Sequence, residues 1–333
     1  MRRRYPLEAK MIRICGSARL VGWILAGLIV SAEVCAQSYP AKPIRVIVPF
    51  PPGGAADWTT RVVANKLSEA LRVGVVVENR SGAGGQLGIE AVVRSRADGY
   101  MLLVSSNGSI TINPHLRKLP YDPMKDLAPV ALMNIVGAAI AVNAAQPINN
   151  LQDLIRVSKE APGGLNYSIS NIGNHMHLSG ELFKIMTGAV LNPVPYKGTA
   201  PATAAVVSGE VAVTISDIVS LLPYATAGRI RILATINSSR FAGFPTVAEL
   251  GFPKYASDGW IGMFAPAGTP PDVVNLLNAE VNRALALPEI QDTFQKAGLY
   301  ANPMKLDELR RFIAEETRQW GEVIARAQIT VGE

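Results

Sequence analysis

One local pattern repeats along the chain from Ile44 onward: a short strand rich in β-branched residues, a loop of small residues, and an amphipathic helix. Residues 44–50 (IRVIVPF) are predicted to form a strand, and residues 57–71 (DWTTRVVANKLSEAL) a helix with its apolar residues on nearly one face. The same alternation recurs at residues 75–95 and again beyond residue 165. Strands that alternate with helices predict an α/β fold with mostly parallel sheets.

The long apolar stretch at residues 127–145 has a glycine, Gly137, near its middle. We interpret this stretch as a strand that leaves one domain and continues into another. The last helix, predicted at residues 306–327, has an apolar face but no further sheet, so we expect the terminal helices to pack back on the first domain. The predicted organisation is a signal peptide (1–36), a discontinuous first domain (37–138 plus 259–333) and an inserted second domain (139–258). Two chain crossings would then form a hinge beside a ligand cleft between the domains.

The first 36 residues read as an export signal with a basic start and an apolar run at residues 20–30. Val34 and Ala36 are small residues at the positions that a signal peptidase requires, which predicts cleavage after Ala36 and a periplasmic location. An uncleaved anchor is the alternative, but the apolar run is much shorter than the roughly 20 residues that span a bilayer. A lipoprotein signal at Cys35 is a further alternative.

The net charge of +6 belongs mostly to this signal. Residues 1–36 hold six basic and two acidic residues, which leaves 26 basic against 24 acidic residues, or +2, for the remainder. The remainder has no basic run, so we do not expect nucleic-acid binding. The cysteines, Cys15 and Cys35, both lie in the signal, so the mature chain would have no disulfide and no thiolate metal site.

The loop after the first predicted strand has very small side chains, PPGGAAD at residues 51–57. Ligands of open α/β sheets bind beyond the carboxyl ends of strands, and a helix that starts there offers unpaired N–H groups and a partial positive charge. We therefore expect an anion-binding loop, with a plain turn as the alternative. Asp57 is expected to be the N-cap of the helix and to pair with Arg61. Whether Trp58 enters the cleft or packs beneath it is left open.

Further loops also place small or polar residues at the start of a helix or the end of a strand. Residues 170–177 (SNIGNHMH) place hydroxyl and amide groups at a helix entry, and Lys197 precedes another helix start. Asp217 follows a strand and either accepts a hydrogen bond from a ligand or caps the next helix. His175, His177 and Glu181 are too few for a zinc site with second-shell support, so no metal is expected. The histidines are expected either to be neutral and hydrogen-bonded at the cleft or to serve packing alone. The glycines of residues 82–88 lack the dinucleotide-binding spacing, so no nucleotide cofactor is expected.

Motifs of common enzyme classes are missing from the sequence. It contains no Gly-x-Ser-x-Gly elbow, no Walker loop and no thiol nucleophile after the signal. A binder of small anions is therefore favoured over an enzyme. The competing hypothesis is an exported hydrolase, for which Ser170 with His175 or His177 is the candidate nucleophile–base pair.

Several segments, taken in order, resemble one family: YPAKPIRVIVPFPPGGAADWTTR, VVVENRSGAGGQLG, ADGYMLL, VPYKGTAPA and FPTVAELG. The chain is similar from about Tyr39 to its C-terminus to the Bug-type periplasmic substrate-binding proteins of tripartite tricarboxylate transporters (TTT). The resemblance implies a two-domain, type II-like Venus-flytrap fold. It also implies a small carboxylate ligand, held largely by backbone amides and ordered waters at helix N-termini and delivered to membrane transporter subunits.

The ligand-binding residues expected from the loops and the resemblance are Pro52, Gly53, Gly54, Ala55, Ala56, Asp57, Ser105, Asn107, Ser170, Asn171, Gly173, Asn174, His177, Lys197, Gly198 and Asp217. No catalytic residue, metal or cofactor is expected. The expected ligand is a di- or tricarboxylate, an acidic amino acid or an aromatic carboxylate, and the chain is expected to be a monomer. Trp58, Met101 and the additional histidine depart from the family pattern and leave the ligand's identity open. A ligand sensor for a membrane signalling partner is a further alternative.

Overall fold

The structure is a computed structural model that describes residues 39–170 and 172–330. The chain divides into two compact units, Met1–Ala41 and Lys42–Glu333, and the architecture below is that of the second unit. The predicted export signal and its cleavage site lie outside the described residues. Among the helices of the described part, none is long and apolar enough to cross a membrane.

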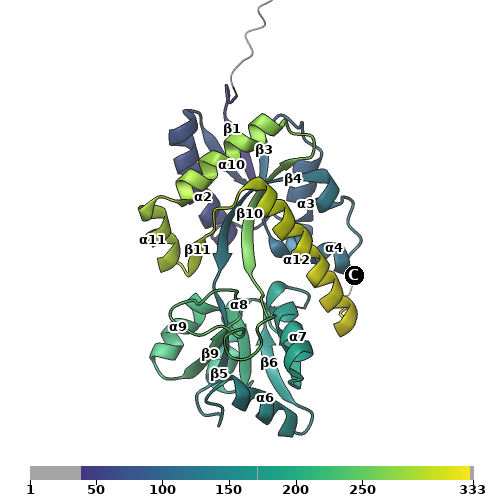
Figure 1. The fold of residues 1–333 in the computed structure, drawn as a ribbon, viewed down its shortest axis with the longest axis vertical. Coiled ribbons are helices and arrows are strands. Elements are labelled where there is room, and N and C mark those ends of the chain that lie inside the picture. Colours follow the sequence, from purple (N-terminus) through teal and green to yellow (C-terminus); the bar gives the residue numbers. More distant parts are fainter. Residues whose placement is uncertain (1–38, 171, 331–333) are drawn as a thin grey trace, which may run out of the picture. The chain divides into compact units, whose positions relative to one another are not determined.

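The first sheet has six strands within the described residues, in the order β11-β4-β10-β3-β1-β2 (Figure 1). The strands are β1 (Ile44–Val48), β2 (Val75–Asn79), β3 (Met101–Ser106), β4 (Leu127–Val136), β10 (Gly259–Pro266) and β11 (Leu299–Ala301). β1 runs parallel to β2 and β3, but β10 runs antiparallel to both β3 and β4. The expectation of a mostly parallel sheet is therefore wrong here, because β10 enters the sheet at the end where β4 leaves it.

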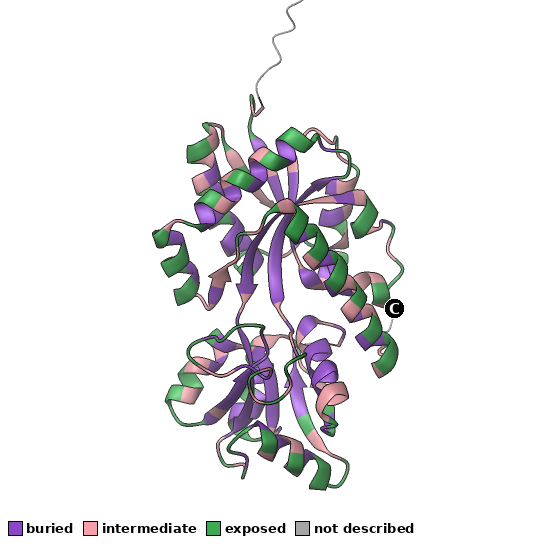
Figure 2. Ribbon diagram, viewed as in Figure 1, coloured by how far each residue is buried: buried purple, intermediate pink, exposed green. Residues whose placement is uncertain are grey.

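The second sheet has five described strands, in the order β7-β6-β8-β5-β9. They are β5 (Ala138–Asn143), β6 (Leu165–Ile169), β7 (Leu191–Pro195), β8 (Val213–Asp217) and β9 (Ile230–Thr235). β6 runs parallel to β7 and β8, whereas β5 runs antiparallel to β8 and β9. The inner strands of both sheets are mostly buried, whereas the edge strands β2 and β7 are partly exposed, and the outer faces of the helices are exposed (Figure 2).

The chain passes between the sheets at two adjacent places. Gly137 alone separates β4 from β5, and Gly259, the first residue of β10, pairs with Val136, the last residue of β4. A Cβ at Gly137 would overlap the ring of Phe241, so only glycine fits this close approach. We keep the division into domains 37–138 plus 259–333 and 139–258 as a proposal.

Each sheet and the helices packed on it are called a lobe below. The helices of the first lobe are α2 (Ala55–Leu71), α3 (Gln86–Val93), α10 (Pro271–Leu285), α11 (Pro288–Lys296) and α12 (Leu306–Ala327), with the short turns η1 (Ala83–Gly85), η2 (Gly108–Ile112), α4 (Asn113–Leu116) and α5 (Pro123–Asp126). Those of the second lobe are α6 (Leu151–Glu160), α7 (His175–Thr187), α8 (Thr199–Ser208) and α9 (Ile218–Thr226).

The C-terminal helix α12 contacts both lobes. It packs on β4 and η2 of the first lobe and on α7 of the second. Trp320, Val323 and Ile324 on its last turns belong to the same buried cluster as Ile140 and Tyr167 of the second sheet. The expectation that the terminal helices return to the first lobe is therefore incomplete, because the apolar face of α12 continues onto the second lobe.

Candidate ligand-binding site

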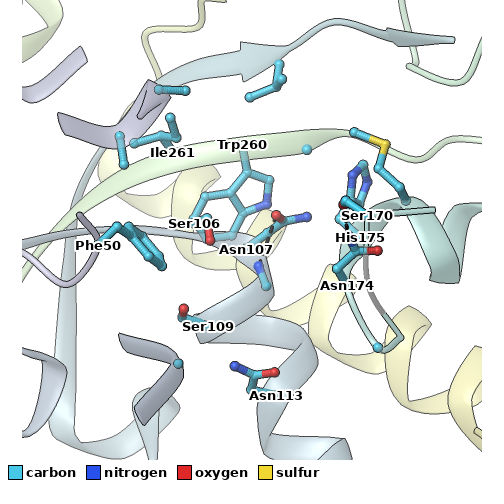
Figure 3. Close-up of a pocket in the computed structure, with 18 of the residues that line it drawn as sticks. Phe50, Ser106, Asn107, Ser109, Asn113, Ser170, Asn174, His175, Trp260 and Ile261 are labelled. Atoms are coloured by element: carbon cyan, nitrogen blue, oxygen red, sulfur yellow. Dashed lines mark hydrogen bonds between the residues drawn. The ribbon is translucent and has the colours of Figure 1, made fainter. Parts of the chain in front are cut away.

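A cavity of about 470 Å³ lies where the two lobes meet (Figure 3). The first lobe contributes the loop between β1 and α2, the segment from the end of β3 to α4, and the start of β10. The second lobe contributes the loop before α7, the first residue of α8 and the end of β8. The cavity therefore lies at the carboxyl ends of strands from both sheets, where open α/β sheets bind ligands.

The N-termini of α2, α7 and α8 all reach the described wall of this cavity, through Ala55 and Ala56, His175 and Met176, and Thr199. The first N–H groups of a helix have no partner within that helix and carry a partial positive charge. The N-cap residues of α2 and α8 are Gly54 and Gly198, and neither helix has a side-chain cap. Backbone donors from both lobes are thus available to an anion in the cavity.

The glycine at the start of α2 is not required by local packing. Gly54 has φ −79°, and an added Cβ would meet only the Pro51 carbonyl oxygen, at 4.0 Å. Its neighbour Gly53 has φ +88°, which favours glycine. The absence of a side chain at Gly54 therefore leaves the cavity open without serving the fold.

Asp57 has a structural role, and the expectation that it is the N-cap of α2 is wrong. The helix begins at Ala55, so the cap position falls on Gly54. The buried Asp57 carboxylate accepts hydrogen bonds from Gly53 N (2.9 Å), Arg61 Nε (3.0 Å) and Asn79 Nδ2 (3.0 Å). Burial acts to raise the pKa of Asp57, but these hydrogen bonds and the Arg61 charge hold it below its usual value. The expected pairing of Asp57 with Arg61 is present.

The loop before α7 is held by its own side chains. Asn174 Nδ2 donates to Ser170 Oγ at 2.6 Å, and Asn174 Oδ1 accepts from His177 N at 2.9 Å. Gly173 N donates to His177 Nδ1 at 3.0 Å. The buried His177 therefore supports the loop and does not line the cavity.

His175 lines the cavity as a neutral ring. Its Nε2 lies 3.0 Å from Ser257 Oγ, and burial lowers the pKa of His175 to about 4. Ser170 has a hydrogen bond to neither histidine within the described residues, so the hydrolase hypothesis gains no support from a nucleophile–base pair. No group of three or more His, Cys, Asp or Glu side chains in the described part of the chain could hold a metal ion.

Among the described residues of the wall, Arg117 and Asp217 carry charged side chains. Arg117 is exposed and lies beside Gly84, whose added Cβ would be 4.0 Å from Nη1. Asp217 ends β8, and its carboxylate neither caps α9 nor makes a hydrogen bond to another described residue. Burial raises the pKa of Asp217 to about 6. The described part of the wall thus combines backbone donors with the Arg117 cation and the Asp217 carboxylate.

Half of the expected residues lie on the cavity wall: Gly54, Ala55, Ala56, Asn107, Ser170, Gly173, Asn174 and Asp217. Asn171 lies outside the described residues. The others lie away from the wall: Pro52, Gly53, Asp57, Ser105, His177, Lys197 and Gly198. Their ligand-binding roles stay predictions without support from this geometry.

Two of these residues lie away from the wall for a simple structural reason. Ser105 is fully buried, and Ser106 faces the cavity instead, because neighbouring strand residues point to opposite sides. Lys197 is exposed and precedes the helix start, whose Thr199 reaches the wall. Phe50, Arg117 and His175 also line the wall. A lone arginine such as Arg117 gives no sequence signal, whereas a neutral, hydrogen-bonded histidine at the cleft is one of the two expectations for His175.

Two tryptophans take different positions. Trp58 does not line the cavity, because its ring packs on Phe294 of α11 with 5.6 Å between ring centroids. Trp260 is almost fully buried, as expected of a core residue, yet one face of it lines the cavity beside Asn107 (Figure 3). Its Nε1 donates to Glu316 Oε2 at 2.5 Å.

Comparisons with known proteins agree with this geometry. A family model described as "Tripartite tricarboxylate transporter family receptor" matches residues 59–329. Protein BugT of Bordetella pertussis is 37% identical over 313 residues, which cover 92% of this chain and 95% of BugT.

Solved structures of similar proteins indicate the same family. Rpa4515 of R. palustris with adipate has a TM-score of 0.74 and 33% identity, over 88% of this chain and 99% of that chain. MatC (Rpa3494) from Rhodopseudomonas palustris with bound malate has a TM-score of 0.69 and 29% identity, over 86% of this chain and 100% of that chain. The chain therefore belongs to the tripartite tricarboxylate transporter family receptors, the Bug-type periplasmic solute-binding proteins.

Proposed function

We propose that this chain is an extracytoplasmic solute receptor that binds a small carboxylate in the cavity between its lobes and delivers it to a tripartite tricarboxylate transporter. The observation that carries the proposal is the convergence of the α2, α7 and α8 N-termini on one cavity. The glycine caps of α2 and α8 leave backbone N–H groups free to bind a carboxylate.

The strength of such binding suits a receptor that must release its ligand. A hydrogen bond to a charged group contributes about 1.5–3 kcal/mol, and each helix N-terminus about 0.3–1 kcal/mol more. A few of these interactions together approach the roughly 8 kcal/mol of micromolar binding. Backbone donors thus provide useful affinity without a cluster of arginines.

The ligand class is inferred from the cavity and from relatives. The structures named above hold adipate and malate, both small dicarboxylates. We propose a di- or tricarboxylate, an acidic amino acid or an aromatic carboxylate for this chain, and no catalytic turnover. Export through the predicted signal, cleavage after Ala36 and transfer to membrane subunits are parts of the same proposal.

A ligand screen tests this function. The mature chain is scanned for thermal stabilisation with succinate, malate, adipate, citrate, aspartate, glutamate, benzoate and, for comparison, ATP. At least one acid is expected to raise the melting temperature, because a ligand that binds only the folded state stabilises it. Stabilisation by ATP alone would contradict the proposal. Co-purification of membrane subunits with the tagged receptor separates transport from sensing.

A further inference from the structure

A buried glutamate lies directly behind the cavity wall. Glu316, on α12, is 7% exposed and does not line the cavity. Within the described residues it has no basic partner, and it accepts instead from neutral donors. Burying an unpaired carboxylate is costly unless its oxygens are well hydrogen-bonded. The bonds it makes are therefore the reason such a group can be held at this position.

Those bonds go to the cavity wall. Glu316 Oε2 accepts from Trp260 Nε1 at 2.5 Å and from Thr111 Oγ1 at 3.2 Å, and Oε1 accepts from Asn107 Nδ2 at 3.4 Å. Trp260 and Asn107 both line the cavity, and Figure 3 shows them side by side. One carboxylate thus holds two adjacent wall side chains from outside.

Glu316 is one of three groups that set the orientation of the Asn107 side-chain amide. Asn107 Oδ1 accepts from Gly108 N at 3.0 Å, and Nδ2 donates to Asp258 O at 3.2 Å as well as to Glu316. Asp258 directly precedes β10, where the chain returns from the second lobe. The orientation of this wall amide is therefore tied to α12 and to one of the chain crossings.

The next turn of α12 reaches the other lobe. Trp320, four residues after Glu316 and on the same helix face, packs edge-on against His175 with 5.7 Å between ring centroids. Gln319 Nε2 donates to Ala256 O at 3.0 Å. One face of α12 thus touches wall residues of both lobes.

We propose that Glu316 is a positioning residue of the ligand site: its carboxylate fixes Trp260 and Asn107 on the first lobe, while α12 keeps them in register with His175 on the second. This inference rests on the proposed function, because it concerns the same cavity. A glutamine at this position could not replace the carboxylate. Its amide has one acceptor oxygen, and its NH₂ would face either the Asn107 donor or those of Trp260 and Thr111.

The test compares Glu316→Gln with Glu315→Gln. Glu315 is the adjacent residue on α12, exposed and paired with Arg318, so it is a matched control. Calorimetry at pH 8, above the raised pKa of Glu316, uses the acid of the panel above that binds the wild type most tightly. Glu316→Gln is expected to weaken binding by about tenfold, because the wall donors lose a charged acceptor. Glu315→Gln is expected to leave the dissociation constant unchanged.

Two further measurements separate positioning from simple stabilisation. The near-UV circular dichroism of the tryptophans, which include Trp260, should change in Glu316→Gln and not in Glu315→Gln. Glu316→Asp should recover part of the affinity because it restores a carboxylate. If Glu316→Gln does not fold, Glu316→Asp takes its place, with weaker binding expected than in the wild type.

The outcomes distinguish the two proposals. If the wild type binds an acid and the Glu316 variant binds it equally well, Glu316 serves stability alone and the inference is wrong. If no acid of the panel binds the wild type, the proposed function fails and the inference fails with it.

Discussion

Asn237, which follows β9, donates a hydrogen bond of 3.1 Å from Nδ2 to Oδ1 of Asp258, the residue just before the second chain crossing. Asn237 is fully buried, and its Nδ2 also donates to Val136 O at 3.0 Å. Its Oδ1 accepts from Ala138 N at 2.9 Å. A single amide therefore satisfies backbone groups on both sides of Gly137 and holds the second crossing beside the first.

Replacing Asn237 by alanine should destabilise the chain substantially. The change leaves Ala138 N and Val136 O without their partner, and each buried unsatisfied group costs about 1–3 kcal/mol. We expect the free energy of unfolding in urea to fall by about 3 kcal/mol. Asn192→Ala, at an exposed asparagine that bonds Gly163 O, is the control and should cost less than about 1 kcal/mol. Equal effects of the two variants would contradict the role of Asn237 at the crossings.

Gly54→Val should impair binding far more than folding. An added Cβ meets no atom closer than 4.0 Å, so the fold tolerates it, but the branched side chain would occupy the space at the α2 N-terminus. We expect the dissociation constant for the best acid to rise by at least about tenfold. The free energy of unfolding should change by about 1 kcal/mol or less.

Gly74→Val is the matched control for this change. Gly74 lies away from the cavity, and its added Cβ would make only ordinary contacts, the nearest at 3.8 Å with Pro43. It should leave the dissociation constant unchanged. A loss of stability in Gly54→Val as large as its loss of binding would indicate a plain structural turn.

The sequence predicts helices and loops well where the signal is local. The apolar periodicity of α12 gives its bounds, Leu306–Ala327, and the small side chains before α2 and α8 indicate the exposed helix starts. The three residues of β11 are too few to show a pattern. The direction of β10 depends on where the chain re-enters the first sheet, which no local pattern encodes.

The composition of the cavity wall is harder to predict because it depends on tertiary packing. The spacing of His175 and His177 does not reveal which ring faces the cavity, since the answer follows from the hydrogen bond of His177 to Gly173 N. Glu315 and Glu316 look alike in the sequence, yet one is exposed and the other is buried against Trp260. Such differences arise from contacts between residues far apart along the chain.

Asp217→Asn should strengthen binding of dicarboxylates that lack a cationic group. Asp217 is a carboxylate on the cavity wall without a side-chain partner among the described residues, so its charge opposes a bound anion. We expect affinity for adipate to increase on the order of tenfold when this charge is removed. Aspartate and glutamate should gain less, because their ammonium group can pair with the native carboxylate.

The pH dependence gives a second measurement for Asp217. Because burial raises the pKa of Asp217 to about 6, the wild type should bind adipate more tightly as the pH falls through this value. Asp217→Asn should lack that dependence, and Asp292→Asn, at an exposed residue of α11, should retain it. Identical pH profiles in wild type and Asp217→Asn would show that the carboxylate does not face the bound anion.

Glu316 should make folding stability depend on pH with a defined sign. Burial raises its pKa from 4.5 to about 7, although the hydrogen bonds from Trp260, Asn107 and Thr111 act in the opposite direction. Between these values the folded state holds more protons than the unfolded state. The corresponding stability is fully present below about pH 4.5 and is lost as the pH rises through about 7.

Urea unfolding from about pH 4.5 to 8 checks this prediction. Asp217, with its pKa raised to about 6, also makes the free energy of unfolding fall as the pH rises. His175, with its pKa lowered to about 4, has the opposite effect and makes it fall as the pH drops below 6.5. The difference between wild type and Glu316→Gln isolates the Glu316 contribution, because the other two groups are common to both. The wild type should lose up to about 3 kcal/mol more than Glu316→Gln as the pH rises from about 4.5 to above 7. Parallel curves for the two proteins would mean that Glu316 stays ionised throughout this range.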